Sequence, residues 1–360
     1  MGEQRFGRRR TALLVLALVL GAALVAVSPL TAAERNSYTV TPLVSDQPGV
    51  APNTDSHLKN AWGLTSSATS PWWVSNNATD TSTLYRGSDG TPFPQPTPLV
   101  VNVAGGPTGA VFNPTTGFIL PVGGTKALFI FDNEDGQILA WNGAQGTTAV
   151  VMHTSPDGGI YKGLAIADTA DGPRLYAADF HNARVDVLDG SFGVVPDSGF
   201  VDPTLTKGYA PFGIQTIGDH VFVSYAKQDA DAEDEIAGQG RGFVDEYDLA
   251  GNLVERVAQH GQLNAPWGLA LAPEGFGRFG GDLLVGNFGD GQINAFEQKA
   301  DGTFEHRGEL RGPDGTSLTI DGLWALQFGQ GGNNGPAGTL FFTAGPDDET
   351  HGLFGQINPS

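Results

Sequence analysis

The chain has 360 residues and a formal net charge of −20, with 52 glycines, 23 prolines and no cysteine. The lack of cysteine excludes disulfide bonds and thiol chemistry, and so acidic a surface repels phosphates, which excludes nucleic acid as a partner. Glycine and proline recur along the whole chain between short apolar runs, a pattern typical of an all-β protein with many turns.

The first 33 residues have the composition of an export signal. Three arginines at residues 8–10 precede an apolar run over residues 12–27, and small residues follow at 31–33. A basic segment, an apolar segment and a small-residue cleavage site in this order are typical of a signal peptide. We expect processing after Ala33 and export to the periplasm or the extracellular space. An uncleaved N-terminal anchor is the alternative, although the run is shorter than the roughly 20 residues that a membrane-spanning helix needs.

The mature chain is expected to be a single domain over residues 34–360. Removing residues 1–33 takes away four arginines and one glutamate, which leaves 15 basic and 38 acidic residues and a net charge of −23. The rest of the sequence contains no second apolar stretch long enough to cross a membrane. We therefore expect no membrane span in the mature chain. We also expect the protein to be a monomer.

The first predicted strand covers residues 38–44 and has no adjacent strand in the sequence to pair with. After it, a motif of an aromatic or small residue, a glycine and an aliphatic residue recurs. An apolar run, a turn and a second strand follow each copy, and a third strand follows most of them, for example at residues 137–141 and 292–296. The motif glycines are 46, 54, 50, 55 and 54 residues apart, at Gly63, Gly109, Gly163, Gly213, Gly268 and Gly322.

Repeats of about 40–50 residues with four short strands each are typical of propeller blades. We therefore predict an all-β fold, a six-bladed β-propeller. A glycine in the innermost strand has a steric reason, because the strands crowd the axis and a missing side chain lets two backbones approach closely. The Trp, Phe and Leu residues beside these glycines are assigned to the contacts between blades and not to a ligand site.

The last repeat contains only three strands before the sequence ends near Ile357. Its missing outer strand has to come from elsewhere in the chain, and residues 38–44 are the strand without a partner. Pairing the two would close the ring and remove an exposed sheet edge. We predict that the N-terminal strand completes the last blade.

Three runs of the sequence resemble those of a known family: residues 43–49 (LVSDQPG), 60–64 (NAWGL) and 342–355 (FTAGPDDETHGLFG). They are similar to a family of uncharacterised exported bacterial proteins, and the resemblance extends over essentially the whole mature chain. In its repeats, that family is similar to the six-bladed NHL and gluconolactonase-like propellers. The resemblance implies a propeller, but it brings no established activity and no catalytic residues.

The loops that precede the inner strands, and those that join second and third strands, meet at one face of a propeller. That face surrounds the mouth of the central channel, where such folds usually bind ligands. We place the functional site there. In this chain these loops carry Asp55, Asp80, Asp132, Asp179, Asp290, Asp321, Asp347, Asp348, Glu349, His57, His181 and His351.

Two sets of residues are candidate metal ligands. Asn76, Asp179 and Asn287 follow the second strands of blades one, three and five, and their hard oxygens suit Ca²⁺. The alternative is that they are turn residues, because Asp and Asn favour tight hairpins. A Zn²⁺ site is the second hypothesis, and it would need a narrow channel mouth at which its three imidazoles converge. These imidazoles belong to His57, His181 and His351.

The longest insertion, residues 227–241, contains an acidic run at 229–235 and is predicted to form a lid over the mouth. No Gly-x-Ser-x-Gly elbow and no complete catalytic set appears in the sequence. We therefore expect a binding or interaction module that holds a small molecule, a glycan or a protein at the acidic mouth. The alternative is a hydrolase or lyase that depends on Ca²⁺ or Zn²⁺ in the central channel.

Overall fold

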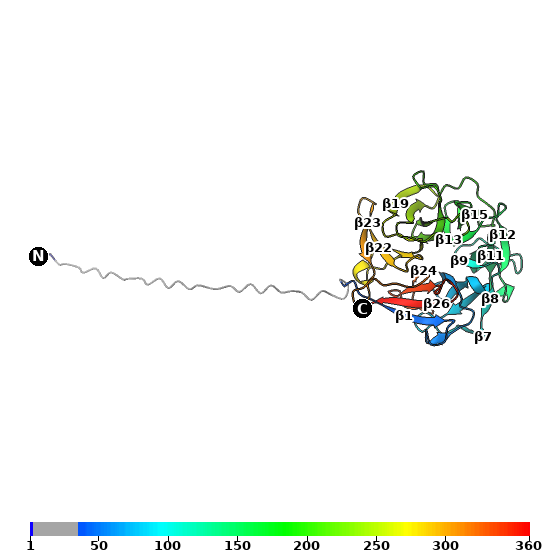
Figure 1. Ribbon diagram of the computed structural model, residues 1–360, viewed down its shortest axis with the longest axis horizontal. Coiled ribbons are helices and arrows are strands. Elements are labelled where there is room, and N and C mark those ends of the chain that lie inside the picture. Colours follow the sequence, from blue (N-terminus) through cyan, green and yellow to red (C-terminus); the bar gives the residue numbers. More distant parts are fainter. Residues whose placement is uncertain (3–34) are drawn as a thin grey trace.

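The computed structural model describes residues 1–2 and 35–360, so the predicted export signal lies almost wholly outside the described residues. Residues 35–360 form a ring of six small sheets around a central channel (Figure 1). This arrangement confirms the predicted all-β, six-bladed propeller. In the described part of the chain, no helix is long and apolar enough to cross a membrane.

Five blades are built from consecutive strands, and the first strands of all six blades contact one another in a ring around the channel. Blade three has three strands and the other four have four. The bounds are β3 (Ala61–Thr65), β4 (Trp72–Asn76), β5 (Thr81–Tyr85) and β8 (Val100–Asn102) in blade one; β9 (Pro107–Phe112), β10 (Phe129–Asn133), β11 (Gln137–Trp141) and β12 (Val150–Thr154) in blade two; β13 (Tyr161–Thr169), β14 (Gly172–Asp179) and β15 (Arg184–Asp189) in blade three; β16 (Tyr209–Ile217), β17 (His220–Lys227), β18 (Phe243–Asp248) and β19 (Leu253–Gln259) in blade four; and β20 (Pro266–Leu271), β21 (Leu283–Asn287), β22 (Ile293–Gln298) and β23 (Phe304–Glu309) in blade five. The connections contain a hairpin of β6 (Pro94–Gln95) and β7 (Thr97–Pro98), and the 3-10 turns η2 (Asn77–Thr79), η3 (Gly143–Gln145) and η4 (Gly277–Phe279).

Blade six joins the two ends of the described chain. Its strands are β24 (Leu323–Phe328), β25 (Leu340–Ala344), β26 (Leu353–Pro359), β1 (Tyr38–Ser45) and the short β2 (Asn53–Thr54). β1 is antiparallel to β26, with Tyr38 opposite Pro359 and Ser45 opposite Leu353. The predicted closure by the N-terminal strand is therefore confirmed.

The motif glycines lie where neighbouring inner strands touch. A Cβ atom on Gly213 would lie 2.0 Å from the carbonyl oxygen of Trp267, and one on Gly63 would lie 2.4 Å from that of Thr108. Both residues they approach belong to the inner strand of the next blade. No side chain fits in such a space, so the expected steric role of these glycines is confirmed.

The sixth member of the motif was assigned wrongly. Leu323 pairs with Ala344 in the way that Ala61 pairs with Asn76, so Ala325 and not Gly322 stands at the position of Gly63. Gly322 precedes β24 and has a φ of +61°, and a Cβ there would lie 2.2 Å from the carbonyl oxygen of Gly345. Gly322 is therefore a turn residue. Because an apolar residue follows it, the sequence there resembles the motif, but three residues before the true position.

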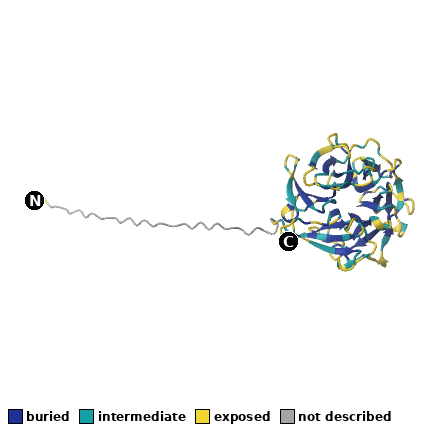
Figure 2. Cartoon of the chain, viewed as in Figure 1, coloured by how far each residue is buried: buried dark blue, intermediate teal, exposed yellow. Residues whose placement is uncertain are grey.

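Hydroxyl groups tie neighbouring blades together beside the motif. Ser224 accepts a hydrogen bond from the amide of Gly213 and donates to the carbonyl of Pro266 in the next blade, at 2.7 Å. Thr343 bridges blades six and one in the same way, through its bond to the carbonyl of Trp62. Figure 2 shows that the strands are mostly buried and that exposed residues lie mainly in the loops. The core is thus distributed between blades instead of forming one central mass.

Deletion of residues 34–46 should destabilise the whole ring, because it exposes the edge of β26 and removes Tyr38, which is buried against Phe276 and Phe279. A loss of about 5 kcal/mol would lower the Tm by roughly 10 °C or more. Thermal unfolding followed by circular dichroism measures this, with Thr39→Ala at an exposed position of β1 as the control. An unchanged Tm in the deletion would refute closure by β1.

Gly213→Ala should lower the free energy of unfolding by about 2–3 kcal/mol, because its methyl group would collide with the backbone of the next blade. Gly338→Ala is the matched control, since nothing lies within 4 Å of a Cβ at that position. Urea unfolding of both variants measures the difference. Equal stabilities would show that the inner strands can move apart without cost.

Candidate functional site

The inner strands all start at one end of the channel and finish at the other, so each end collects a different set of residues. At one end, the first residues of the inner strands lie beside the loops that join the second and third strands and beside the insertion before β18. There, charged and amide side chains form a connected group that we call the acidic mouth. Its members are Asn60, Asn77, Glu134, Lys162, Asp234, Glu235 and Glu349.

Lys162 is at the centre of the acidic mouth, and only 2% of its side chain is exposed. Its Nζ atom donates to Glu134 Oε1 at 2.5 Å and to Asp234 Oδ1 at 3.1 Å. The ammonium also lies 5.3 Å from the centre of the Trp62 ring, a cation–π distance. Burial opposes the charge of Lys162, but the nearby carboxylates, led by Glu134, outweigh it and raise its pKa.

Three indole rings close the channel next to Lys162. Trp62 stacks on Trp324 with ring centres 3.6 Å apart, and Trp267 meets both rings edge-on. The indole N–H of Trp267 donates to the carbonyl of Lys162 at 2.7 Å, and that of Trp324 donates to Asn60 Oδ1 at 3.1 Å. The predicted core role of these aromatic residues thus agrees with their packing.

Glu349 is held on a strained segment of the loop between β25 and β26. Its Oε2 atom accepts a hydrogen bond from Asn60 at 2.5 Å. Asp347, Asp348 and Glu349 all have left-handed backbones, with φ between 50° and 62°, and Asn60 has a φ of 45°. Such strain tends to persist at functional sites, where the surroundings hold it in place. Burial raises the pKa of Glu349.

The insertion at residues 228–241 crosses the acidic mouth between β17 and β18. Asp234 reaches Lys162, the Nδ1 atom of His181 lies 3.2 Å from the carbonyl oxygen of Ala232, and Gln228 donates to the carbonyl of Phe180 at 2.6 Å. Burial raises the pKa of Glu235 to about 7. The insertion therefore contributes two carboxyl groups to the mouth that it covers.

The three proposed calcium ligands stand at one register position, opposite the first residue of each inner strand, as the sequence predicted. All three are fully buried, and each is hydrogen-bonded locally, in its own hairpin or an adjoining loop. The structure does not link them by any hydrogen bond or ion pair within the described residues. Their side-chain partners are Thr81 and Thr83 for Asn76, Asn182 and Arg184 for Asp179, and Asp290 for Asn287.

The three histidines are engaged separately. His57 pairs with Asp55 at 3.0 Å and His351 pairs with Asp46 at 2.9 Å, while His181 contacts the insertion. Across residues 35–360, no group of three His, Asp or Glu side chains is arranged to hold a metal ion. Calcium and zinc binding stay predictions.

Sequence reasoning missed Lys162, although the repeat contained a signal for it. Tyr161 pairs with Asp179 in the way that Ala61 pairs with Asn76, so the two blades share one register. Lys162, the residue after Tyr161, therefore stands at a position where blades one, four, five and six have an aromatic residue. A lysine at an aromatic position of a buried strand departs from the repeat. Glu134 and Glu235 gave no such signal, because they lie in acidic loops far apart in the sequence.

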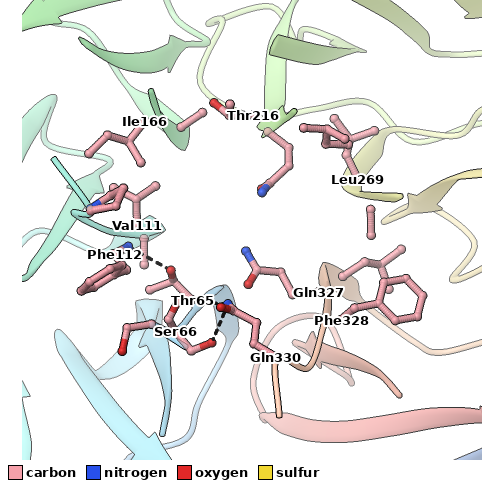
Figure 3. Close-up of a pocket in the computed structure, with 18 of the residues that line it drawn as sticks. Thr65, Ser66, Val111, Phe112, Ile166, Thr216, Leu269, Gln327, Phe328 and Gln330 are labelled. Atoms are coloured by element: carbon pink, nitrogen blue, oxygen red, sulfur yellow. Dashed lines mark hydrogen bonds between the residues drawn. The ribbon is translucent and has the colours of Figure 1, made fainter. Parts of the chain in front are cut away.

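The opposite end of the channel is hollow and uncharged. The ends of all six inner strands and the loops after β3 and β24 surround a cavity of about 520 Å³ (Figure 3). None of its lining residues carries a charge. The two ends of the channel therefore differ in both shape and electrostatics.

No family model matches the chain. Two uncharacterized proteins of Acanthamoeba polyphaga mimivirus are similar to it over most of its length. Uncharacterized protein R648 is 32% identical over 335 residues, which cover 89% of this chain and 80% of that protein. Uncharacterized protein L690 is 30% identical over 346 residues, which cover 89% of this chain and 86% of that protein. These relatives are viral and do not support the bacterial family that the sequence resemblance implied.

Several solved propellers share the fold. A glucose dehydrogenase aligns with a TM-score of 0.53 and 16% identity, over 89% of this chain and all of that one. A protein of unknown function from Bacteroides thetaiotaomicron aligns with a TM-score of 0.54 and 11% identity, over 89% of this chain and 76% of that one. Identities this low show the fold alone, whereas the identity to the viral proteins shows the family: the chain belongs to the family of the uncharacterized mimivirus proteins R648 and L690.

Proposed function

We propose that the protein is a binding module that holds a positively charged small molecule at the acidic mouth. The observation that carries this proposal is the convergence of four carboxyl groups on a single ammonium group. Glu134, Asp234, Glu235 and Glu349 surround Lys162, which neutralises at most one negative charge. The remaining field attracts a cation, in a chain whose net charge is −20.

Lys162 itself illustrates the chemistry of the site. Two carboxylates and the face of Trp62 surround its ammonium group, which is the combination that recognises amines and quaternary ammonium ions. A ligand of this class would share the carboxylates with Lys162 or displace it from them. With the export expected from residues 1–33, the ligand would be met outside the cytoplasm.

The insertion has to move for a ligand to enter. The link between Asp234 and Lys162 is the contact most easily broken, because the Asp234 side chain is 71% exposed and water screens its charge. Glu134 and Glu349 are held on the blades by Asn77 and Asn60 and would stay in place. The insertion thus supports the proposal as a movable cover, whereas the blades provide the fixed part of the site.

A metal-dependent hydrolase or lyase is the second candidate function. The observation in its favour is the set of hard oxygen ligands at the mouth, which Glu134, Glu349 and Asn60 provide. The fit is partial, because Lys162 already binds oxygens of Glu134 and Asp234. A metal ion would have to displace this ammonium group before it could polarise a substrate.

Choline and spermidine should bind saturably in isothermal titration calorimetry. The double variant Glu134→Gln with Glu349→Gln should weaken their binding at least about tenfold, which corresponds to about 1.4 kcal/mol. Glu297→Gln with Glu305→Gln is the control, since it removes the same charge on the outer side of blade five. A rise in Tm with Ca²⁺ or Zn²⁺ that the mouth variant abolishes would favour the second candidate. If neither amine nor metal binds, both candidates are wrong.

Choline should bind more tightly at pH 8 than at pH 5.5, by roughly fivefold, which corresponds to about 1 kcal/mol. The pKa of Glu235 is raised to about 7, so this carboxyl is neutral at pH 5.5 and adds a negative charge at pH 8. Choline keeps its charge across this range, and Glu235→Gln should flatten the profile. The same pH dependence in Glu235→Gln would assign it to another group.

A further inference from the structure

The cavity at the uncharged end of the channel has the size and shape of a ligand site. Its volume of about 520 Å³ lies within the range of roughly 300–1,000 Å³ that is usual for small-molecule pockets. Toward the acidic mouth the channel narrows to a space of about 20 Å³ beside Gly63, Gly109 and Trp267. The cavity is therefore open at one end and closed at its floor.

The cavity wall has unused hydrogen-bonding capacity. Within residues 35–360, the side-chain amides of Gln215 and Gln327, which line the cavity, make no hydrogen bond to the protein. Figure 3 shows Gln327 reaching toward the middle of the cavity. Each free amide offers two donors and one acceptor. These groups can therefore bind a ligand without losing an internal bond.

Other polar groups at the rim are already committed and give the wall a fixed shape. Gln330 donates to the carbonyl of Ser66 at 3.3 Å, and the hydroxyl of Thr65 accepts a bond from the amide of Phe112 at 3.0 Å. Asn334 donates to the carbonyl of Ser67 at 2.7 Å, which joins the loops of blades six and one. The pocket is largely preformed, which reduces the entropy lost on binding.

The rest of the wall is apolar. Phe112, Phe328, Ile166 and Leu269 line it, together with Leu271, a residue that is 52% exposed. An exposed large apolar residue beside unpaired amides is typical of a pocket that covers the apolar face of a ligand and binds its polar edge. The ligand should thus carry both kinds of surface.

We propose that this cavity is a second binding site, for a neutral, hydroxyl-rich molecule of the monosaccharide or disaccharide class. A sugar has hydroxyl groups for Gln215 and Gln327, and an apolar C–H face for the phenylalanine and leucine side chains. A charged ligand would be desolvated here without an ionic partner, because no lining residue is charged. The proposal does not depend on the acidic mouth.

Isothermal titration calorimetry with methyl β-D-glucopyranoside, maltose and trehalose tests the proposal, with the anionic sugar glucuronate as the charged counterpart. At least one neutral sugar should bind saturably, and glucuronate should bind at least about tenfold more weakly. The double variant Gln215→Met with Gln327→Met keeps the side-chain length and removes both amides, and it should weaken sugar binding at least about tenfold. Gln95→Met, at an exposed position in β6, is the control for the substitution.

Two further measurements separate this site from the acidic mouth. Glu134→Gln with Glu349→Gln should leave sugar binding unchanged while amine binding falls. The Tm of each variant shows whether it is folded, and Gln327→Met alone replaces the double variant if the latter unfolds. The proposal is overturned if no neutral sugar binds, if the amide variants bind sugar as well as the unaltered protein does, or if glucuronate binds equally well.

Discussion

Backbone contact between neighbouring inner strands, made at the motif glycines, determines the width of the channel and hence everything inside it. A Cβ on Gly213 would lie 2.0 Å from the carbonyl oxygen of Trp267, so no side chain fits between these two strands. Hydroxyl bridges such as that of Ser224 reinforce the same contact. Large residues are therefore confined to the levels on either side. Three indoles and Lys162 occupy one level, and the free amides of the cavity occupy the other.

This separation gives one channel two chemically distinct ends. At the acidic mouth, charge is concentrated and already partly satisfied from within, by Lys162 and by the insertion. At the far end, the wall is neutral, and Gln215 and Gln327 have no internal partners. The ring of indoles, with Trp62 stacked on Trp324, keeps the two apart.

The fold was predictable from the sequence to a greater extent than the site. Steric exclusion at the axis leaves a regular trace, one glycine per blade, and only the sixth copy misled, because Ala325 takes that position and the nearby turn supplies Gly322 instead. The acidity of the loops also indicated which end of the ring carries the group of carboxyl side chains. The chemistry of the acidic mouth was not predictable, because the group around Lys162 joins blades two and six with an insertion of blade four. The sequence does not reveal that the amides of Gln215 and Gln327 lack internal partners, since a glutamine near the end of a strand can equally face water.

The pairing of β1 with β26 also has a consequence for how the protein folds. Blade six contains the first and the last strands of the described chain, so its sheet cannot be completed until synthesis has reached Leu353–Pro359. Pairings between such distant segments form slowly, because the chain loses much entropy before the contact stabilises it. Until then blade six presents an unpaired edge, the kind of surface that joins other chains. The pairing that completes the native ring is therefore the one whose delay exposes the protein to aggregation.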